Sequence, residues 1–230
     1  MTQNNTGKLI AGIALLASFI VVMVIIFMPI FDDGNALNYL DNLYNSISKG
    51  SANYIAKVEH LVEKHPDQAV TLTLKVGDDS AVAGRAATVL ETNGAEVTAD
   101  GDTLQIRGQI NAILSACLED AEAGYHNRGE ELASKYGMDA RAALHAWWAA
   151  LGASEKDLNR QKLFNAAHLV HTVQTKAVEC SYNYYGIEPG KIGDRWSTVL
   201  FSLVFYVIYT IWYGYAIMFI FEGLGLRLAH

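Results

Sequence analysis

Two long uncharged stretches constrain the fold of this chain more than any other feature of its sequence. Residues 9–31 and 196–221 contain no Asp, Glu, Lys or Arg. At about 1.5 Å per helical residue, each stretch is long enough to cross a hydrocarbon core of about 30 Å. We therefore predict two transmembrane helices at these positions, with short tails at residues 1–8 and 222–230 and the lipid bilayer as a partner.

The first stretch has to be distinguished from a cleaved signal peptide, because Lys8 and the amino terminus form a weak positive region before it. The apolar part of a signal peptide is only about 7–15 residues long and ends in a small-residue cleavage site. Residues 9–31 are longer than that and end in Pro29-Ile30-Phe31. We therefore expect an uncleaved membrane anchor.

Charges next to the two stretches indicate their orientation. Lys8 and Arg227 favour a cytoplasmic location for both tails, whereas Lys191 and Arg195 favour the opposite one. Loops longer than about 60 residues are translocated largely regardless of their charge. We therefore expect residues 32–195 to lie outside the cytoplasm, as the periplasmic domain of a bacterial inner-membrane protein.

The central residues 32–195 are acidic. Of the 24 acidic and 17 basic residues of the chain, only Glu222, Lys8 and Arg227 lie outside them, which leaves 23 acidic and 15 basic residues and a formal charge of −8. Nucleic-acid binding needs clustered Lys and Arg, so no nucleic-acid partner is expected. The short tails leave no room for a folded domain on the other side. The chain alone is therefore not expected to be a sensor kinase, a chemoreceptor or an ATP-driven pump.

A small sheet is predicted at about residues 69–108, where apolar and polar residues alternate in short runs around one amphipathic helix. A glycine at position 94 ends the helix, and the turn Asp100-Gly101-Asp102 joins the last two strands. The predicted order is a strand at 69–76, a helix at 81–92 and strands at 95–99 and 103–107, which together form a βαββ unit.

Helical periodicity covers the other central residues. It predicts two short amphipathic helices within 35–64 and a glycine-interrupted helical pattern at 109–136. Ser154 is predicted to cap a new helix, which separates helices at 139–151 and 155–182. The predicted fold class is an α+β extracytoplasmic domain, consisting of a βαββ unit and a helical layer, between two transmembrane helices. The chain is helix-dominated overall.

Cys117 and Cys180 are the only cysteines in the sequence. In an oxidising compartment a disulfide between them would stabilise the fold by roughly 4 kcal/mol in the chain-entropy model. Cys117 lies in an apolar run, where buried free thiols are common. We expect two buried thiols, and the disulfide is the alternative.

Three histidines have the arrangement closest to that of a metal site. His168 and His171 stand three positions apart on a predicted helix, which places both imidazoles on one side, and His145 lies on the neighbouring helix. No Glu-x-x-His or His-Glu-x-x-His pattern accompanies them. We expect hydrogen-bonding histidines and neither a metal nor another cofactor. A metal or haem site is the weaker alternative.

The remaining polar motifs do not indicate a reaction. The sequence contains no nucleophile elbow, Walker loop, dinucleotide fingerprint or Cys-x-x-Cys pair, so the chain is not expected to be an enzyme. Adjacent acidic residues have diverging side chains or cap turns, and we expect solvated surface positions for them. These pairs are Asp32-Asp33, Asp78-Asp79, Glu119-Asp120 and Glu130-Glu131.

Polar-tipped side chains form a stripe on the second apolar stretch. Ser202, Tyr206, Tyr209 and Tyr213 recur at helical spacing. Unpaired hydroxyls are costly in hydrocarbon, so the stripe should face protein, with Gly214 allowing close approach. The first stretch offers few donors, so we expect these five residues to bind another subunit. Packing on the first helix of the same chain is the alternative.

The architecture, rather than any motif, indicates the function. A two-pass chain with one outer domain fits a non-catalytic accessory, scaffold or assembly subunit of a larger membrane complex. The main alternative is a self-assembling homo-oligomer, such as a channel-like ring or a polysaccharide chain-length regulator, which the chain resembles in layout. A weaker alternative is a metal- or haem-binding redox subunit that uses His145, His168 and His171.

Overall fold

The computed structural model describes residues 5–30, 34–51, 53–77 and 79–226. As predicted, the fold is helix-dominated, with 73% of the described residues helical, a small three-stranded sheet and two apolar helices near the ends. It divides into a terminal unit, Met1–Gly50 with Pro189–His230, and a central unit, Ser51–Glu188. Several residues used in the predictions lie outside the described ones: Phe31, Asp32, Asp33, Asp78 and Arg227.

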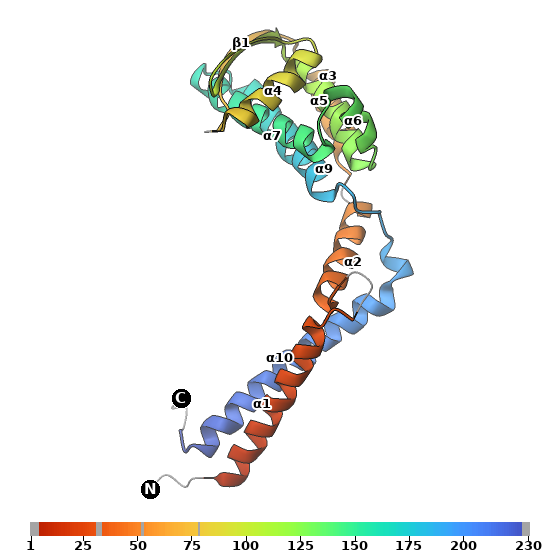
Figure 1. The fold of residues 1–230 in the computed structure, drawn as a ribbon, viewed down its shortest axis with the longest axis vertical. Coiled ribbons are helices and arrows are strands. Elements are labelled where there is room, and N and C mark those ends of the chain that lie inside the picture. The colour runs from red at the N-terminus through yellow and green to blue at the C-terminus, as the bar shows by residue number, and fades with distance from the viewer. Residues whose placement is uncertain (1–4, 31–33, 52, 78, 227–230) are drawn as a thin grey trace. The chain divides into compact units, whose positions relative to one another are not determined.

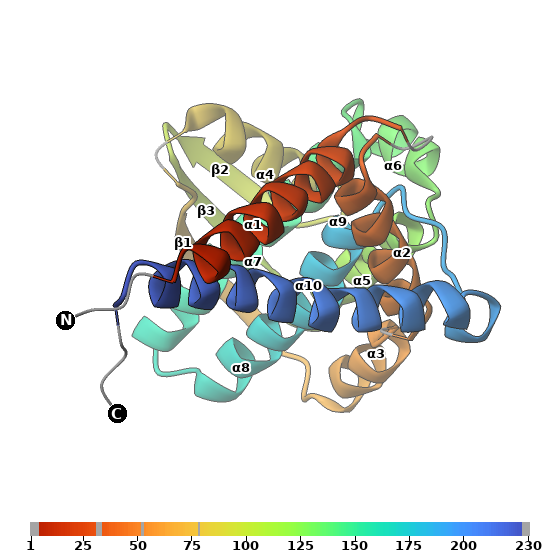
Figure 2. The same ribbon diagram turned by 90° about the horizontal axis from the view of Figure 1, so that it is seen from below.

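Two apolar helices that lie side by side form the core of the terminal unit. α1 (Thr6–Phe27) packs along α10 (Trp196–Gly223), as Figures 1 and 2 both show. Each helix is long and apolar enough to cross a membrane. The two apolar stretches of the sequence therefore form the two candidate spans.

The ends of these helices differ from the predicted ones. α1 ends at Phe27 rather than at residue 31, because Met28 precedes Pro29 and adopts the extended backbone that residues before proline favour. α10 continues past residue 221 to Gly223.

A third helix, α2 (Ala36–Ser51), packs against the segment that precedes α10. The N–H of Gly190 donates a hydrogen bond of 2.9 Å to the carbonyl of Ser46, and a Cβ at Gly50 would lie 2.6 Å from the Gly190 carbonyl oxygen. The 3₁₀ turn η2 (Ile192–Asp194) then leads into α10. Glycines at both positions therefore permit this close backbone approach.

The central unit contains an antiparallel sheet in the order β1-β3-β2. β1 (Ala69–Lys75) pairs with one edge of β3 (Thr103–Gln109), and β2 (Glu96–Asp100) pairs with the other edge. α4 (Ser80–Thr92) connects β1 to β2 and completes the predicted βαββ order.

One face of the sheet is buried. Leu72 on β1 lies opposite Ile106 on β3, and both are almost fully buried, whereas the residues between the buried ones on β1 are exposed. α4 and α7 (Ala140–Arg160) cover the buried face (Figure 1). The alternation in the sequence therefore marks the face that meets the core.

Polar side chains at the C-terminal end of α7 and at its C-cap form hydrogen bonds with the open edge of β1. The carboxylate of Asp157 accepts a hydrogen bond of 3.0 Å from the N–H of Thr73, and Nε2 of Gln161 donates one of 2.9 Å to the carbonyl of Thr71. Gln161 also donates to Asp157 at 2.9 Å. These contacts cover an edge that would otherwise be available for pairing with another chain.

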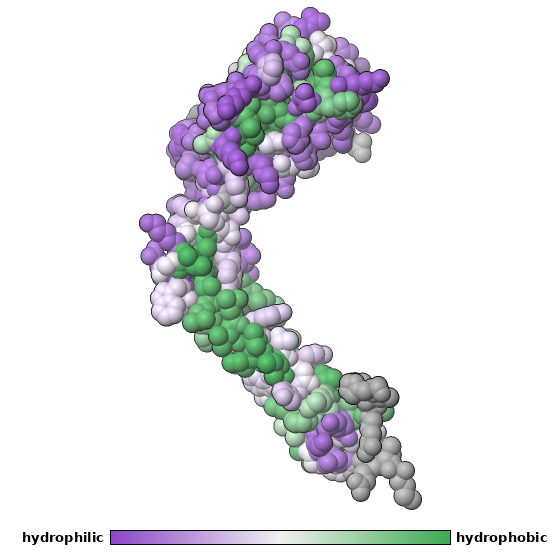
Figure 3. Space-filling view, turned by 180° about the vertical axis from the view of Figure 1, so that it is seen from behind, coloured by the Kyte–Doolittle hydropathy of each residue, from purple (hydrophilic) through white to green (hydrophobic). Residues whose placement is uncertain are grey.

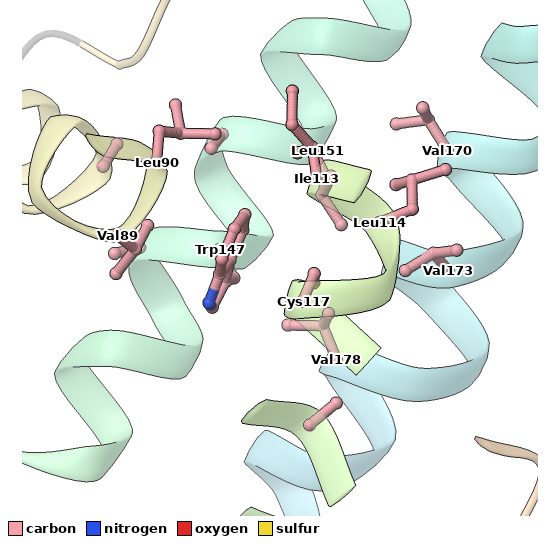
Figure 4. Packing of buried hydrophobic residues seen from close by; sticks show 14 of the residues in the cluster. Val89, Leu90, Ile113, Leu114, Cys117, Trp147, Leu151, Val170, Val173 and Val178 are labelled. Atoms are coloured by element: carbon pink, nitrogen blue, oxygen red, sulfur yellow. The ribbon is translucent and has the colours of Figure 1, made fainter. Parts of the chain in front are cut away.

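The helical layer packs around Trp147 of α7, which is fully buried. Figure 4 shows its indole between Val89 and Leu90 of α4 on one side and Cys117 on the other. The other helices of this layer are α3 (Ile55–Lys64), α5 (Ile110–Tyr125), α6 (Gly129–Tyr136), α8 (Phe164–Val173), the π-helical turn η1 (Gln174–Val178) and α9 (Glu179–Tyr184).

The predicted helix break between residues 151 and 155 is wrong, because α7 runs through it to Arg160. Ser154 does not cap a helix: its hydroxyl donates back to the carbonyl of Ala150 at 2.8 Å. Gly152 faces Gln174, whose Nε2 would lie 2.7 Å from a Cβ at that position. The glycine serves close packing rather than termination, and the actual break follows at Gln161.

Both cysteines are free thiols. Cys117 is fully buried on α5, and Cys180 on α9 is half-buried. Burial, together with the negative charge of Asp120, raises the pKa of Cys117 well above its usual value. Cys117 is therefore an unreactive core residue.

Candidate functional site

Ser202, the first residue of the polar stripe on α10, has a hydroxyl partner in the same chain. The hydroxyl of Tyr44 on α2 lies 2.6 Å from Oγ of Ser202, and Ser202 also donates to the carbonyl of Val199 at 2.8 Å. Ser202 is 9% exposed. Its hydroxyl therefore has partners within its own chain, one of which comes from α2 and was not predicted.

The three tyrosines of the stripe differ in their surroundings: two pack on α1, and one is exposed. The ring of Tyr209 stacks on Phe19 of α1 with centroids 4.2 Å apart, and the ring of Tyr213 lies 5.2 Å from the same phenyl group. Tyr206 is 69% exposed, and its hydroxyl has no hydrogen-bond partner within the described part of the chain. Packing on α1, the alternative considered from the sequence, thus accounts for two of the tyrosine rings and leaves Tyr206 uncovered.

The close approach between the helices occurs at glycines other than Gly214. A Cβ at Gly12 would lie 2.7 Å from the backbone nitrogen of Ile220, and one at Gly223 would lie 2.5 Å from that of Leu9. Gly214 has no described atom near its Cβ position. Small residues at helix contacts are the signal that could have identified Gly12 and Gly223 from the sequence.

An ion pair joins the ends of the two apolar helices. Nζ of Lys8 lies 2.6 Å from the carboxylate of Glu222. Both side chains are nearly half exposed, so the pair contributes little to stability in water. It does place the start of α1 beside the end of α10, which agrees with their antiparallel packing.

The outward faces of α1 and α10 are apolar. Ile10 on α1 is 64% exposed and Phe201 on α10 is 67% exposed. Figure 3 shows a mainly hydrophobic surface on these helices and a mainly hydrophilic surface on the central unit. An apolar surface of this extent is typical of a helix that faces lipid or another protein.

The three candidate histidines are not brought together. His145 on α7 stacks on Trp148 with centroids 5.8 Å apart, and His171 on α8 lies 3.1 Å from a carboxylate oxygen of Glu155. His168 lines a cleft between the end of α3 and the start of α8. Among the described residues no group of three His, Cys, Asp or Glu side chains could hold a metal ion. These histidines therefore have three different environments.

A buried polar network centres on Asp120, which the sequence analysis placed at the surface. Asp120 is 3% exposed and accepts hydrogen bonds from Trp147 Nε1 at 2.7 Å, from Lys135 Nζ at 2.8 Å and from the hydroxyl of Tyr136. The expectation was wrong because Asp120 lies on the buried face of α5. Its partners come from α6 and α7, which sequence periodicity does not reveal.

The hydroxyl of Tyr136 also accepts a hydrogen bond from a residue at the end of another helix. Asn93 at the end of α4 donates a hydrogen bond of 2.6 Å to the Tyr136 hydroxyl. Burial and the hydrogen bond to Asp120 raise the pKa of Tyr136 to about 12. The network links four helices and has the properties of a structural element rather than of a reactive site.

A cleft of about 670 Å³ lies between the end of α3 and the start of α8 in the central unit. Lys64, His65, Lys162 and His168 contribute its basic and imidazole groups, and apolar side chains including Phe164 contribute much of the rest. No local sequence pattern marks this cleft, because its walls come from two connections that are about 100 residues apart in the chain.

Comparison with known proteins gives no relative of this chain: no family model, curated protein or solved structure matches it.

Proposed function

We propose that this chain is a two-pass membrane protein that serves as a non-catalytic accessory or assembly subunit of a larger membrane complex. The central unit would lie outside the cytoplasm. The proposal rests on Tyr206, which is exposed and whose hydroxyl has no hydrogen-bond partner among the described residues, on a helix whose other exposed side chains are mostly apolar.

An unpaired hydroxyl is costly on a helix that crosses a membrane. In hydrocarbon a hydroxyl without a hydrogen-bond partner costs free energy. If α10 lay in water, the surface around Tyr206 would not need to be so apolar. The Ser202 hydroxyl is paired with that of Tyr44, and the rings of Tyr209 and Tyr213 pack on Phe19. Among the described residues Tyr206 has neither kind of contact. A helix of another subunit with a hydrogen-bonding group at the depth of Tyr206 would satisfy it.

The packing of α1 on α10 supports the same proposal. The hairpin buries Phe19 and Gly12 but leaves most large apolar side chains of both helices exposed. Two helices in contact can cover only one side of each other. The remaining surface is available to lipid and to partner helices.

Purification of the full chain from its native membrane in a mild detergent, followed by native mass spectrometry, tests the proposal. We expect other membrane proteins to co-elute in a fixed ratio. A large complex that contains only this chain would instead support the homo-oligomer, and a monomer would contradict both functions.

A further inference from the structure

We propose that the cleft between α3 and α8 binds a small amphiphilic anion, with a carboxylate or phosphate group and a short hydrocarbon part. The cleft lies within the central unit, so the inference does not depend on the membrane topology.

The charge of the cleft is opposite to that of the unit that contains it. The central unit, residues 51–188, has 12 basic and 19 acidic residues, a formal charge of −7. The described lining of the cleft includes Lys64 and Lys162 but no Asp or Glu. A lining that contributes two ammonium groups and no carboxylate favours an anion over a cation.

Lys162 occupies a backbone conformation that would suit glycine better. It has a φ of +62°, and it forms the left-handed residue of the motif that ends α7. In this motif Lys162 N–H bonds to the carbonyl of Asn159 at 3.1 Å, and Leu163 N–H bonds to that of Leu158 at 2.9 Å. A side chain other than glycine costs free energy here, and this one carries a charge to the cleft.

His65 supplies a further donor. Its Nδ1 is buried and has no hydrogen-bond partner within the described residues. Because buried N–H groups without an acceptor are the rarer case, we assign the proton to Nε2. With the proton on Nε2, His65 contributes an N–H donor to the set of residues that line the cleft.

The start of α8 adds backbone donors to these side chains. The N-cap residue Leu163 makes no side-chain cap, and the first intrahelical bond is donated by Ala167 to the carbonyl of Leu163 at 2.9 Å. The amides of the three residues before Ala167 therefore point out of the helix start. They supplement the positive potential of the lysines.

The apolar part of the ligand follows from exposed hydrocarbon at the same cleft. Phe164 is 61% exposed and Leu61 is 45% exposed, and both line it. Burial of this surface by a short alkyl chain would be favourable, whereas a purely inorganic anion would leave it in water. An amphiphilic anion matches both groups of side chains.

Isothermal titration calorimetry of the full chain in zwitterionic nanodiscs tests the proposal, with empty nanodiscs subtracted. The probes are hexanoate and hexyl phosphate, with hexanol and inorganic phosphate as partial ligands. We expect both amphiphilic anions to bind more tightly than either partial ligand. Equal affinity for hexanol and hexanoate would overturn the anionic part of the assignment, and equal affinity for phosphate and hexyl phosphate the apolar part.

Charge-matched variants locate the site. Lys64→Gln/Lys162→Gln should weaken hexyl phosphate binding about tenfold, as expected for the loss of two exposed ion pairs. Lys57→Gln/Lys156→Gln changes the net charge equally at two exposed lysines outside the cleft and should leave binding unchanged. Equal effects of the two double variants would overturn the proposal.

One substitution separates binding from folding. Lys162→Gly relieves the left-handed strain, so the chain should be at least as resistant to thermal unfolding as the wild type, while hexyl phosphate binding weakens. Unchanged binding by this variant would contradict the role of Lys162.

Nanodiscs with anionic lipid identify the source of the ligand. If the bilayer supplies it, the apparent affinity for added hexyl phosphate should fall when phosphatidylglycerol is included, because the lipid competes. An unchanged affinity would identify a water-soluble anion as the ligand. Both results are compatible with the proposed site.

Discussion

The hydroxyl of Tyr44 lies 2.6 Å from Oγ of Ser202, although the two residues are 158 positions apart in the chain. The contact fixes α2 against α10 near the start of the apolar span. It shows how a hydroxyl on the apolar helix is satisfied by a helix that is itself not long or apolar enough to cross a membrane.

A double-mutant cycle should detect this contact. Tyr44→Phe and Ser202→Ala should each destabilise the terminal unit, with a coupling free energy of about 0.6 kcal/mol, the average for hydrogen bonds between membrane helices. Unfolding of the full chain in mixed micelles measures it. Ser18→Ala is the control, because Ser18 donates to Leu15 of its own helix at 2.9 Å and should not couple to Tyr44.

Loss of the Tyr206 hydroxyl should weaken assembly. Tyr206→Phe keeps the ring but removes the group for which we infer a partner, so native gels of membrane extracts should show a smaller complex. Tyr215→Phe is a matched control, since Tyr215 is 52% exposed and nine residues further on, on the opposite side of the helix. If Tyr206→Phe with Tyr209→Phe and Tyr213→Phe leaves the complex size unchanged, the stripe does not dock a partner.

Cysteine labelling should give the membrane orientation. Sites introduced at Thr6 and Ala229 should be protected from a membrane-impermeant reagent in intact cells, and one at Glu91 should react. Glu91 is exposed on α4, in the central unit. The reverse labelling pattern would place the central unit in the cytoplasm.

Removal of the Asp157 carboxylate should open the edge of β1. Asp157→Ala leaves the Thr73 N–H without its acceptor, and we expect a loss of about 1–3 kcal/mol in the free energy of unfolding. Faster hydrogen exchange of the Thr73 amide would locate the effect. Arg160→Ala removes only the 3.4 Å ion pair of a 66% exposed side chain and should cost far less.

The stability contributed by Tyr136 should disappear at high pH. Its pKa of about 12 in the folded protein is above the reference value of 10.0, so folding favours the protonated phenol. The contribution is therefore complete below pH 10 and is lost as the pH rises through 12. Denaturation of the wild type and of Tyr136→Phe should show a stability difference that narrows over this interval, and a constant difference would contradict the shift.

Local sequence patterns were sufficient to predict the elements whose signal lies within one segment of the chain. Absence of charge over more than twenty residues led directly to α1 and α10, because a run of this length and composition is typical of a long apolar helix that could cross a membrane. Alternation led to β1 and β3, because side chains of a strand point to opposite faces with a period of two. Each of these signals depends only on neighbours in the chain.

Tertiary packing decided which of these faces meet. Periodicity placed Ser202, Tyr206 and Tyr213 on one stripe, but only the packing of α1 and α2 showed that Ser202 is paired and Tyr206 is exposed. The residue type of Asp120 does not reveal whether its carboxylate lies in solvent or, as in this fold, in a buried network. Such contacts join segments far apart in sequence, and their geometry depends on helix positions that no local pattern specifies.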